Sequence, residues 1–209
     1  MTAQSDDNNI VHVIDDEIDI RESLLLLLGN NGFKVSTYVS AEDFLANIAQ
    51  VTSGCILSDI RMDEIDGMML QKILLSKNIV LPMIFITGHG DVPMCAKAMK
   101  NGAIDFLLKP FSKDTLLQTV RHALVIGEAK QRQTREHTQI EQRYETLTAR
   151  EKGVFLLLVE SEGHHSSKSV AQSLSLSVRT VEKHRLSIFK KMQTKNIAQL
   201  VSLSKHLSL

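Results

Sequence analysis

The feature that most constrains the fold is an alternation of short apolar runs with stretches of helical apolar spacing. The runs are rich in Val, Ile and Phe, and a near-continuous run such as MIFIT suits a sheet covered on both faces. Strands that alternate with helices imply a parallel sheet whose crossovers are right-handed. The predicted strands span residues 10–14, 34–38, 54–57, 83–87 and 105–108. The predicted helices between them span residues 18–28, 41–48, 67–75 and 92–99.

The pattern changes in the second half of the chain. A helix is predicted to begin near Ser112 and to run far into the polar stretch AKQRQTREHTQIEQRYET. An exposed helical linker is favoured over a short coiled coil there, because the heptad signal is thin. No strand signal follows, so a small all-helical domain is expected at the end. Its predicted helices span residues 148–159, 168–174, 178–192 and 197–207.

The distribution of charge separates these two halves. The net charge is zero, but residues 1–121 carry ten basic and sixteen acidic side chains, whereas residues 147–209 carry ten basic and only four acidic ones. A basic half favours a polyanion as its partner. With 209 residues the chain is long enough for two domains, each with its own core.

Composition and termini indicate a protein of the reducing cytoplasm, with no membrane partner. A hydrophobic content of 43% is ordinary for a soluble protein, and no apolar run reaches the roughly 20 residues that a membrane span needs. The N-terminus is polar and acidic, unlike a signal peptide. Cys55 and Cys95 lack CxxC spacing and nearby His partners, so buried free thiols are expected.

Polar residues stand at the ends of four predicted strands. Asp15 and Asp16 follow the first, Asp59 the third, Thr87 ends the fourth and Lys109 follows the fifth. In a doubly wound sheet, ligands bind outside the carboxyl ends of the strands, so these side chains are expected to converge. Carboxylates without His or Cys favour Mg²⁺, and a metal, a hydroxyl and an ammonium facing one carboxylate indicate a phosphoryl-transfer site.

Each of these residues also has a structural reading. Asp15 or Asp16 could cap the following helix, Thr87 could belong to a turn, and Lys109 could extend over the surface. A shared position at strand ends favours the functional interpretation, with Asp59 as the central acceptor.

DD after the first strand, D after the third, T after the fourth and KP after the fifth resemble the receiver domain of bacterial two-component systems. The segment ITGHGDVPMCAKAMKNGAIDFLLKPF is similar to the FixJ subgroup, and the likeness covers residues 10–124. It implies a flavodoxin-like (βα)5 fold with strand order 2-1-3-4-5. It also implies phosphoryl transfer from a sensor histidine kinase to Asp59.

The resemblance assigns further roles. It implies that Thr87 and Lys109 contact the phosphoryl oxygens, that Phe106 moves inward with Thr87, and that the Lys109–Pro110 bond is cis. It implies dimerisation through the surface around residues 92–108. The implied Mg²⁺ ligands are Asp15, Asp16, Asp59 and the backbone carbonyl of Arg61.

Three features depart from the receiver pattern or extend it. Asp63 replaces a common proline and, with its acidic neighbours, adds negative charge near the metal. Phe106 lacks the hydroxyl of the tyrosine found in many receivers, so a switch there acts through packing. Arg61 and His89, each two residues past a site residue, are expected to tune the lifetime of the phosphoryl group.

The C-terminal segment SKSVAQSLSLSVRTVEKHRLSIFKKM reads as helix, tight turn and helix. Ser177 is a suitable N-cap, and Val181, Ile188 and Met192 form one apolar stripe. Amphipathicity alone fits a solvated helix packed on a neighbour. The turn-linked pair and the basic charge instead favour a helix for the major groove. The opposite face presents Arg179, Glu182, Lys183, Leu186 and Lys190.

L-T-x-R-E and R-T-V-E-x-H-R resemble the LuxR-type DNA-binding domain of FixJ- and NarL-like proteins, over residues 147–209. The match implies double-stranded DNA as partner and a helix-turn-helix at residues 167–186. It places Glu182, Lys183 and Leu186 against bases. GHHSSK departs from the usual G-x-x-N-K, and His164 and His165 there fit an exposed loop better than a metal site. The residues assigned to phosphates are Lys168, Arg179, Thr180 and Lys190.

The sequence therefore predicts a DNA-binding transcription regulator, not an enzyme. The expected parts are a receiver at residues 10–124, a helical linker at 125–146 and a DNA-binding domain at 147–209. Phosphorylation is expected to produce a homodimer that binds promoters, with RNA polymerase as a further partner. Two alternatives remain: a haloacid-dehalogenase-type phosphatase, which usually shows D-x-D where this chain has DDE, and an interaction module that is not phosphorylated.

Overall fold

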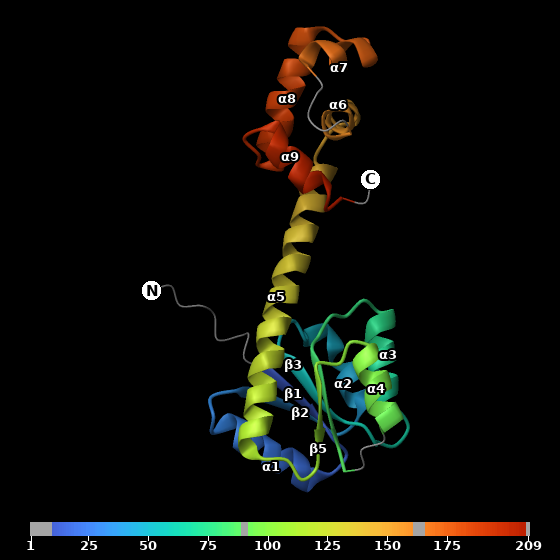
Figure 1. Ribbon diagram of the computed structural model, residues 1–209, viewed down its shortest axis with the longest axis vertical. Helices are drawn as coiled ribbons and strands as arrows, with labels where there is room; N and C mark the ends of the chain where they lie inside the picture. The colour runs from blue at the N-terminus through green and yellow to red at the C-terminus, as the bar shows by residue number, and fades with distance from the viewer. Residues whose placement is uncertain (1–9, 89–91, 161–165, 208–209) are drawn as a thin grey trace. The chain divides into compact units, whose positions relative to one another are not determined.

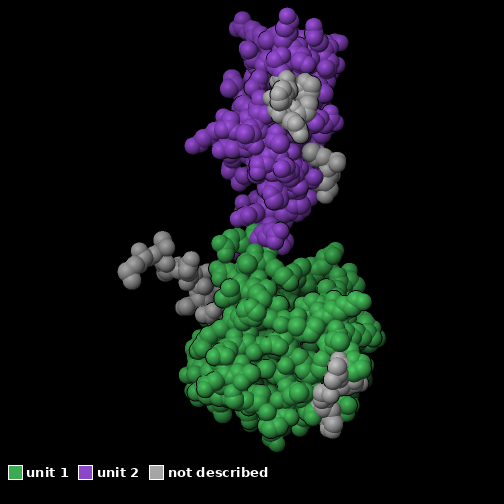
Figure 2. All heavy atoms as spheres, viewed as in Figure 1, with its two compact units in different colours: residues 1–132 green, residues 133–209 purple. Residues whose placement is uncertain are grey.

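The computed structural model describes residues 10–88, 92–160 and 166–207. The chain divides into two compact units, residues 1–132 and 133–209, which Figure 2 colours separately. Each unit has its own hydrophobic core. Helix α5 (Lys113–Glu145) begins in the first unit and ends in the second.

The first unit is built on a parallel sheet of five strands in the order β2-β1-β3-β4-β5, which confirms the predicted fold class and strand order. Four helices besides α5, and the short 3-10 helix η2 (Ile48–Gln50), connect these strands. The strands are β1 (Ile10–Ile14), β2 (Lys34–Tyr38), β3 (Cys55–Asp59), β4 (Met83–Thr87) and β5 (Asp105–Leu108). The helices are α1 (Ile18–Gly29), α2 (Ala41–Ala46), α3 (Gly67–Ser76) and α4 (Val92–Lys100).

Helices cover both faces of this sheet, as its continuous apolar strands require. Figure 1 shows α1 and α5 on one side of the sheet and α2, α3 and α4 on the other. Side chains alternate along each strand, so Val11 and Val13 enter the core under α1 and α5, while Ile14 enters the core under α2 and α3. The sheet is therefore buried on both faces, and the polar residues stand at the edge where its strands end.

The strand register brings the predicted polar residues to one edge. Ile14 pairs with Ser58, so the next residue, Asp15, stands beside Asp59 at the end of β3. Thr87 ends β4 and pairs with Leu108 of β5, which places Lys109 directly beyond the strand. The convergence expected from strand ends alone is thus a consequence of in-register parallel pairing.

The second unit consists of helices joined by turns and contains no strand in its described residues. The last turns of α5 contribute Ile140 and Tyr144 to its core. In the described ranges, no helix of the protein is long and apolar enough to cross a membrane. The other helices are α6 (Ala149–Val159), α7 (Ser167–Ser173), α8 (Val178–Met192) and α9 (Ile197–Ser204).

Most helices differ from their predicted bounds by one residue, and α9 ends three residues early, at Ser204. Two further differences have a visible cause. The third strand extends to Asp59, because backbone pairing with β4 continues to Ile86 after the apolar run has ended. Residues expected as one helix over 41–48 form the shorter α2 and then η2.

Helix α5 packs on the first unit beyond residue 124, where Gln131 donates a side-chain hydrogen bond to the carbonyl of Thr52. The residues expected as an exposed linker therefore contribute to both units.

Gly67, the first residue of α3, tests how closely this helix approaches the site. A Cβ there would lie 2.5 Å from the carbonyl oxygen of Asp59 and 3.0 Å from the ring of Phe85. Gly67→Ala is expected to lower the free energy of unfolding of the first unit by about 1–3 kcal/mol, because this overpacking shifts backbone. Urea denaturation followed by circular dichroism measures it. Gly29→Ala is the control, since no atom lies within 4 Å of a Cβ at that position; equal losses for both variants would refute the close approach.

Candidate functional site

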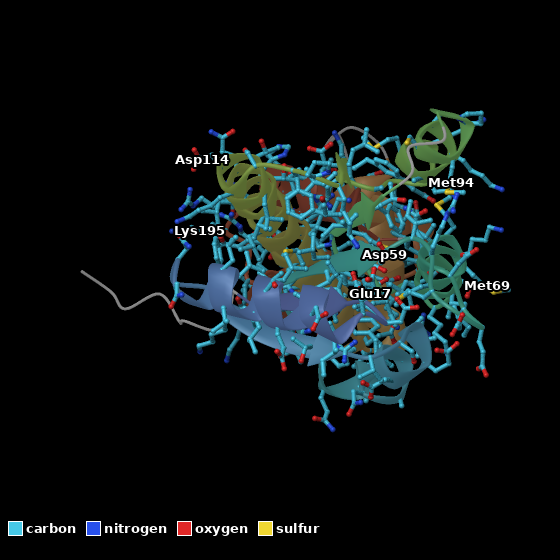
Figure 3. All side chains as sticks on the ribbon, turned by 90° about the horizontal axis from the view of Figure 1, so that it is seen from below. Glu17, Asp59, Met69, Met94, Asp114 and Lys195 are labelled. Carbon is cyan, nitrogen blue, oxygen red and sulfur yellow. The ribbon has the colours of Figure 1, made fainter. Side chains whose placement is uncertain are left out.

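The ammonium group of Lys109 lies between two buried carboxylates at the carboxyl-end edge of the sheet. Its Nζ is 3.1 Å from Oδ1 of Asp59, 3.4 Å from Oδ2 of Asp15 and 3.9 Å from Oε1 of Glu17. Asp15 is 1% exposed and Asp59 is 7% exposed. Figure 3 looks onto this edge and shows Asp59 and Glu17 next to each other. Because buried carboxylates need a compensating charge, Lys109 is what allows the pair to lie together.

Backbone amides bind the remaining oxygens of the two carboxylates. The amide of Glu17 donates to Oδ1 of Asp15 at 2.9 Å, and the amide of Arg61 donates to Oδ2 of Asp59 at 2.8 Å. Nη1 of Arg21 donates to the carbonyl oxygen of Asp15 at 2.7 Å, which ties α1 to this loop. Each carboxylate is therefore oriented with one oxygen toward the chain and the other toward Lys109.

The pKa directions at the site follow from burial and this pairing. Burial raises the pKa of Asp15 and outweighs the amide of Glu17 and the charge of Lys109, which act in the opposite direction. Burial disfavours the charged form of Lys109, but Asp15 and Asp59 outweigh it and hold the pKa of Lys109 above its usual value. The ammonium is thus a stable positive charge beside Asp59.

Asp16 does not join the other two carboxylates. Its side chain is exposed and borders an open concavity of about 310 Å³ together with Asp63 and Glu64. Among the described residues no group of three His, Cys, Asp or Glu side chains is arranged to hold a metal ion. Of the three aspartates, Lys109 therefore binds Asp15 and Asp59, and Asp16 is exposed. As hard oxygen donors, the three aspartates still fit Mg²⁺ in their chemistry.

The predicted switch residues lie on the two strands that follow β3 in the sheet, Thr87 at the end of β4 and Phe106 on β5. Thr87 is buried, and Phe106 is half-buried against the core that contains Phe85, with which it pairs across β4 and β5. The Lys109–Pro110 peptide bond is cis. The side chain of Arg61 is exposed. His89, expected to tune the phosphoryl lifetime, lies outside the described residues.

In the second unit, α8 has the two faces that the sequence predicted. Val181, Ile188 and Met192 are fully buried, and the oxygen of Ser177 accepts the amide hydrogen bond of Thr180 as the N-cap. The turn before α8 contains Ser175 in the left-handed conformation. The opposite face of the helix is exposed and consists of Arg179, Glu182, Lys183, Leu186 and Lys190.

A buried carboxylate holds α8 against α6. Oε2 of Glu151 lies 2.6 Å from Nζ of Lys191, and Oε1 accepts a 2.6 Å hydrogen bond from Ser187. Glu151 also closes a capping box with Thr148 at the start of α6. Burial alone would raise the pKa of Glu151, but hydrogen bonds from Lys191, Ser187 and Thr148 outweigh it and lower the pKa to about 2. The sequence reading missed this contact, although T-x-x-E before an apolar run signals the capping box.

A second contact fixes α7 on α8. Nη1 of Arg185 donates to Oγ of Ser167 at 2.7 Å, and Ser166 caps α7 by accepting from the amide of Ser169. Lys168 is exposed on the same short helix. Residues 161–165, which include Gly163, His164 and His165 of the altered loop, lie outside the part of the chain that the structure describes.

Comparisons with known proteins agree with both units. The family model described as "Response regulator receiver domain" matches residues 11–121, and "Bacterial regulatory proteins, luxR family" matches residues 145–204. The transcriptional regulatory protein FixJ of Rhizobium meliloti (strain 1021) is 39% identical over 194 residues, covering 93% of this chain and 94% of that protein. The response regulator protein TmoT of Ectopseudomonas mendocina is 34% identical over 203 residues, covering 97% of this chain and 91% of that protein.

A solved structure agrees over the same length. The response regulator StyR aligns with a TM-score of 0.82 at 38% identity, covering 95% of this chain and 98% of that one. The chain belongs to the family of two-component response regulators with a LuxR-type DNA-binding domain. This response regulator is accordingly a FixJ-like transcription regulator, and family members of this kind take their signal from a histidine kinase and bind DNA.

The Glu151 contact predicts a pH-dependent stability for the second unit of this response regulator. A carboxylate whose folded pKa is lowered stabilises the fold above its unfolded pKa of about 4.5, and this contribution is lost as the pH falls toward 2. Glu151→Gln is therefore expected to lower the free energy of unfolding by on the order of 2–3 kcal/mol at pH 7, because Lys191 loses its carboxylate partner.

Urea denaturation of both proteins between pH 7 and pH 2 measures this difference, which is expected to shrink below pH 4.5. Glu145→Gln is the matched control, since Glu145 forms only an exposed ion pair with Lys152 and such pairs contribute about 0.2–1 kcal/mol. A Glu151→Gln deficit that stays constant down to pH 2 would contradict the assignment.

Proposed function

We propose that this response regulator accepts a phosphoryl group on Asp59 from a phosphohistidine of a sensor histidine kinase. The observation that carries the proposal is the pairing of a nearly buried Asp59 with the ammonium of Lys109 at 3.1 Å. A carboxylate oxygen of Asp59 attacks phosphorus, so an O–P bond forms while the N–P bond to the imidazole breaks. Lys109 offsets the negative charge that arrives with the phosphoryl group.

Mg²⁺ belongs to this proposal, since receivers generally use it. The residues that would hold it are the carboxylates of Asp15, Asp16 and Asp59 and the backbone carbonyl of Arg61. When bound, the metal neutralises phosphoryl oxygens and favours transfer to the carboxylate. The exposed side chain of Asp16 supports this role, because it is free of the lysine that binds Asp15 and Asp59.

The proposed switch runs from the phosphoryl group to the surface of α4 and β5. Thr87 would contact a phosphoryl oxygen with its hydroxyl, and Phe106 would repack into the space beside it. The half-buried position of Phe106 supports such a movement, since its ring is already at the border of the core. Repacking would alter the surface around residues 92–108 and promote a homodimer.

Labelling with a phosphodonor tests the acceptor. The full chain is incubated with labelled acetyl phosphate and Mg²⁺, and covalent label is counted. Wild type and Asp63→Asn are expected to be labelled, because Asp63 is an exposed neighbour outside the Lys109 pair. Asp59→Asn is expected to remain unlabelled, since an amide is a poor nucleophile. Equal labelling of Asp59→Asn would refute the assignment, and repeated turnover of acetyl phosphate without stable label would instead favour a phosphatase.

The second unit is proposed to bind promoter DNA through α7 and α8, with RNA polymerase as a further partner. The exposed basic face of α8 supports a major-groove position for this helix. Glu182, Lys183 and Leu186 are proposed to face bases. A DNA partner also supports a cytoplasmic location. The residues proposed to contact phosphates are Lys168, Arg179, Thr180 and Lys190.

The domain boundaries that we propose are those predicted from the sequence. They are a receiver at residues 10–124, a helical linker at 125–146 and a DNA-binding domain at 147–209. The two family matches, at residues 11–121 and 145–204, support limits of this kind. Helix α5 supports a linker that is helical throughout.

Salt dependence tests the phosphate contacts. Binding of the full chain to a labelled duplex is measured by fluorescence anisotropy between 50 and 200 mM salt, conditions in which counterion release gives a slope of about −0.9 per phosphate contact. Arg179→Ala and Lys190→Ala are each expected to flatten the slope by about one. Lys205→Ala, an exposed lysine after α9, is the control and should leave the slope unchanged. Unaltered slopes for the two α8 variants would contradict the proposed face.

A further inference from the structure

The helix α8 exposes two large apolar side chains, Val178 at its first residue and Leu186 in the middle of its exposed face. Leu186 is 71% exposed, more than any other large apolar residue in the described part of the chain. A single exposed leucine is ordinary on a protein surface. The surroundings of Leu186 on this helix are unusual, because Lys183 stands one turn before it and Lys190 one turn after it, and both lysines are exposed. Leu186 therefore shares a surface with the cations offered to a polyanion.

The structure separates the cations of α8 into two groups. Arg185 donates to Ser167, and Lys191 pairs with Glu151, so these two are used within the unit. The positive charge that remains on the exposed face is that of Arg179, Lys183 and Lys190. When these side chains contact DNA, Leu186 lies among them, so its side chain leaves water and is buried against the major groove. The only apolar group that the floor of the major groove presents is the 5-methyl of thymine.

Glu182 lies one turn before Leu186 on the same exposed face. An ionised carboxylate only accepts hydrogen bonds, and phosphates repel it. On a surface that approaches DNA it is therefore stable only over the base edges, where the exocyclic amino groups of cytosine and adenine donate. Cytosine is the better match, because its major-groove edge offers a donor without the adjacent N7 acceptor of adenine.

We propose that Leu186 recognises a thymine through its 5-methyl group and that Glu182 recognises a cytosine beside it. The proposal rests on the DNA-binding function proposed above and adds the base chemistry that the operator must contain. It makes Leu186 and Glu182 the determinants of specificity, while Arg179 and Lys190 determine affinity and its salt dependence.

The experiment begins with the full chain and a library of randomised double-stranded DNA. Duplexes that bind are enriched, and each thymine of the enriched site is then replaced singly by deoxyuridine, which lacks only the 5-methyl group. At one thymine per half-site, wild-type affinity is expected to fall about three- to five-fold, the value for one buried methyl group. Leu186→Ala is expected to bind the thymine duplex more weakly and to show no further loss with deoxyuridine.

Val125→Ala is the matched control. It removes another apolar side chain, 66% exposed on α5, and should keep the full wild-type response to deoxyuridine. Because Leu186 and Val125 are both exposed, neither change is expected to alter the thermal unfolding midpoint. The proposal is overturned if deoxyuridine is tolerated at every position of a specific site, or if Leu186→Ala retains the wild-type penalty.

Glu182→Gln tests the second base. Wild type is expected to prefer cytosine over thymine by about five-fold or more at one position next to the methyl-sensitive thymine. The variant should bind DNA more tightly overall, because a negative charge has been removed, and yet lose this preference. An unchanged preference would overturn the role of Glu182, since loss of repulsion alone raises affinity for all sequences equally. If the library yields no enriched sequence and binding does not depend on salt, DNA binding itself fails, and this inference fails with it.

Discussion

The pairing of Lys109 with Asp15 and Asp59 is the interaction on which the arrangement of the candidate site in the first unit depends. Two carboxylates this deeply buried would repel each other and resist ionisation without the ammonium between them. The pair forms because parallel register brings the ends of β1, β3 and β5 to one edge. The sheet thus positions the two carboxylates close together, and the positive charge of Lys109 offsets their mutual repulsion.

The second unit also contains a buried carboxylate paired with a lysine, and there the pair holds two helices together. Glu151 is buried between α6 and α8, where Lys191 and Ser187 bind both of its oxygens. This contact fixes α8 without using the cations of its exposed face. Arg185 similarly braces α7 through Ser167. The helix is therefore held by some of its polar residues and presents the others, which is the division that recognition of DNA requires.

Much of the fold could be predicted because apolar periodicity is local. Four of the five strands have the predicted bounds, and β3 differs because its last residues pair with β4 although their side chains are polar. Helix α2 ends earlier than predicted, at Ala46, where Asn47 donates back to Asp43 and the chain continues as η2. The end of β3 depends on backbone pairing with another strand and the end of α2 on a side-chain hydrogen bond, and a periodic pattern contains neither.

The sequence by itself determined the order of the elements, the position of Asp15, Asp59, Thr87 and Lys109 at strand ends, and the basic character of the second half, because these follow from neighbours along the chain. Only the tertiary structure decided which charges bind each other. In the folded chain Lys109 pairs with two of the three aspartates, and Asp16 is exposed. In the second unit Lys191 pairs with Glu151, and Arg185 donates a hydrogen bond to Ser167. The reason is physical: a charged side chain selects its partner by distance across packed elements, and that distance exists only after the chain has folded.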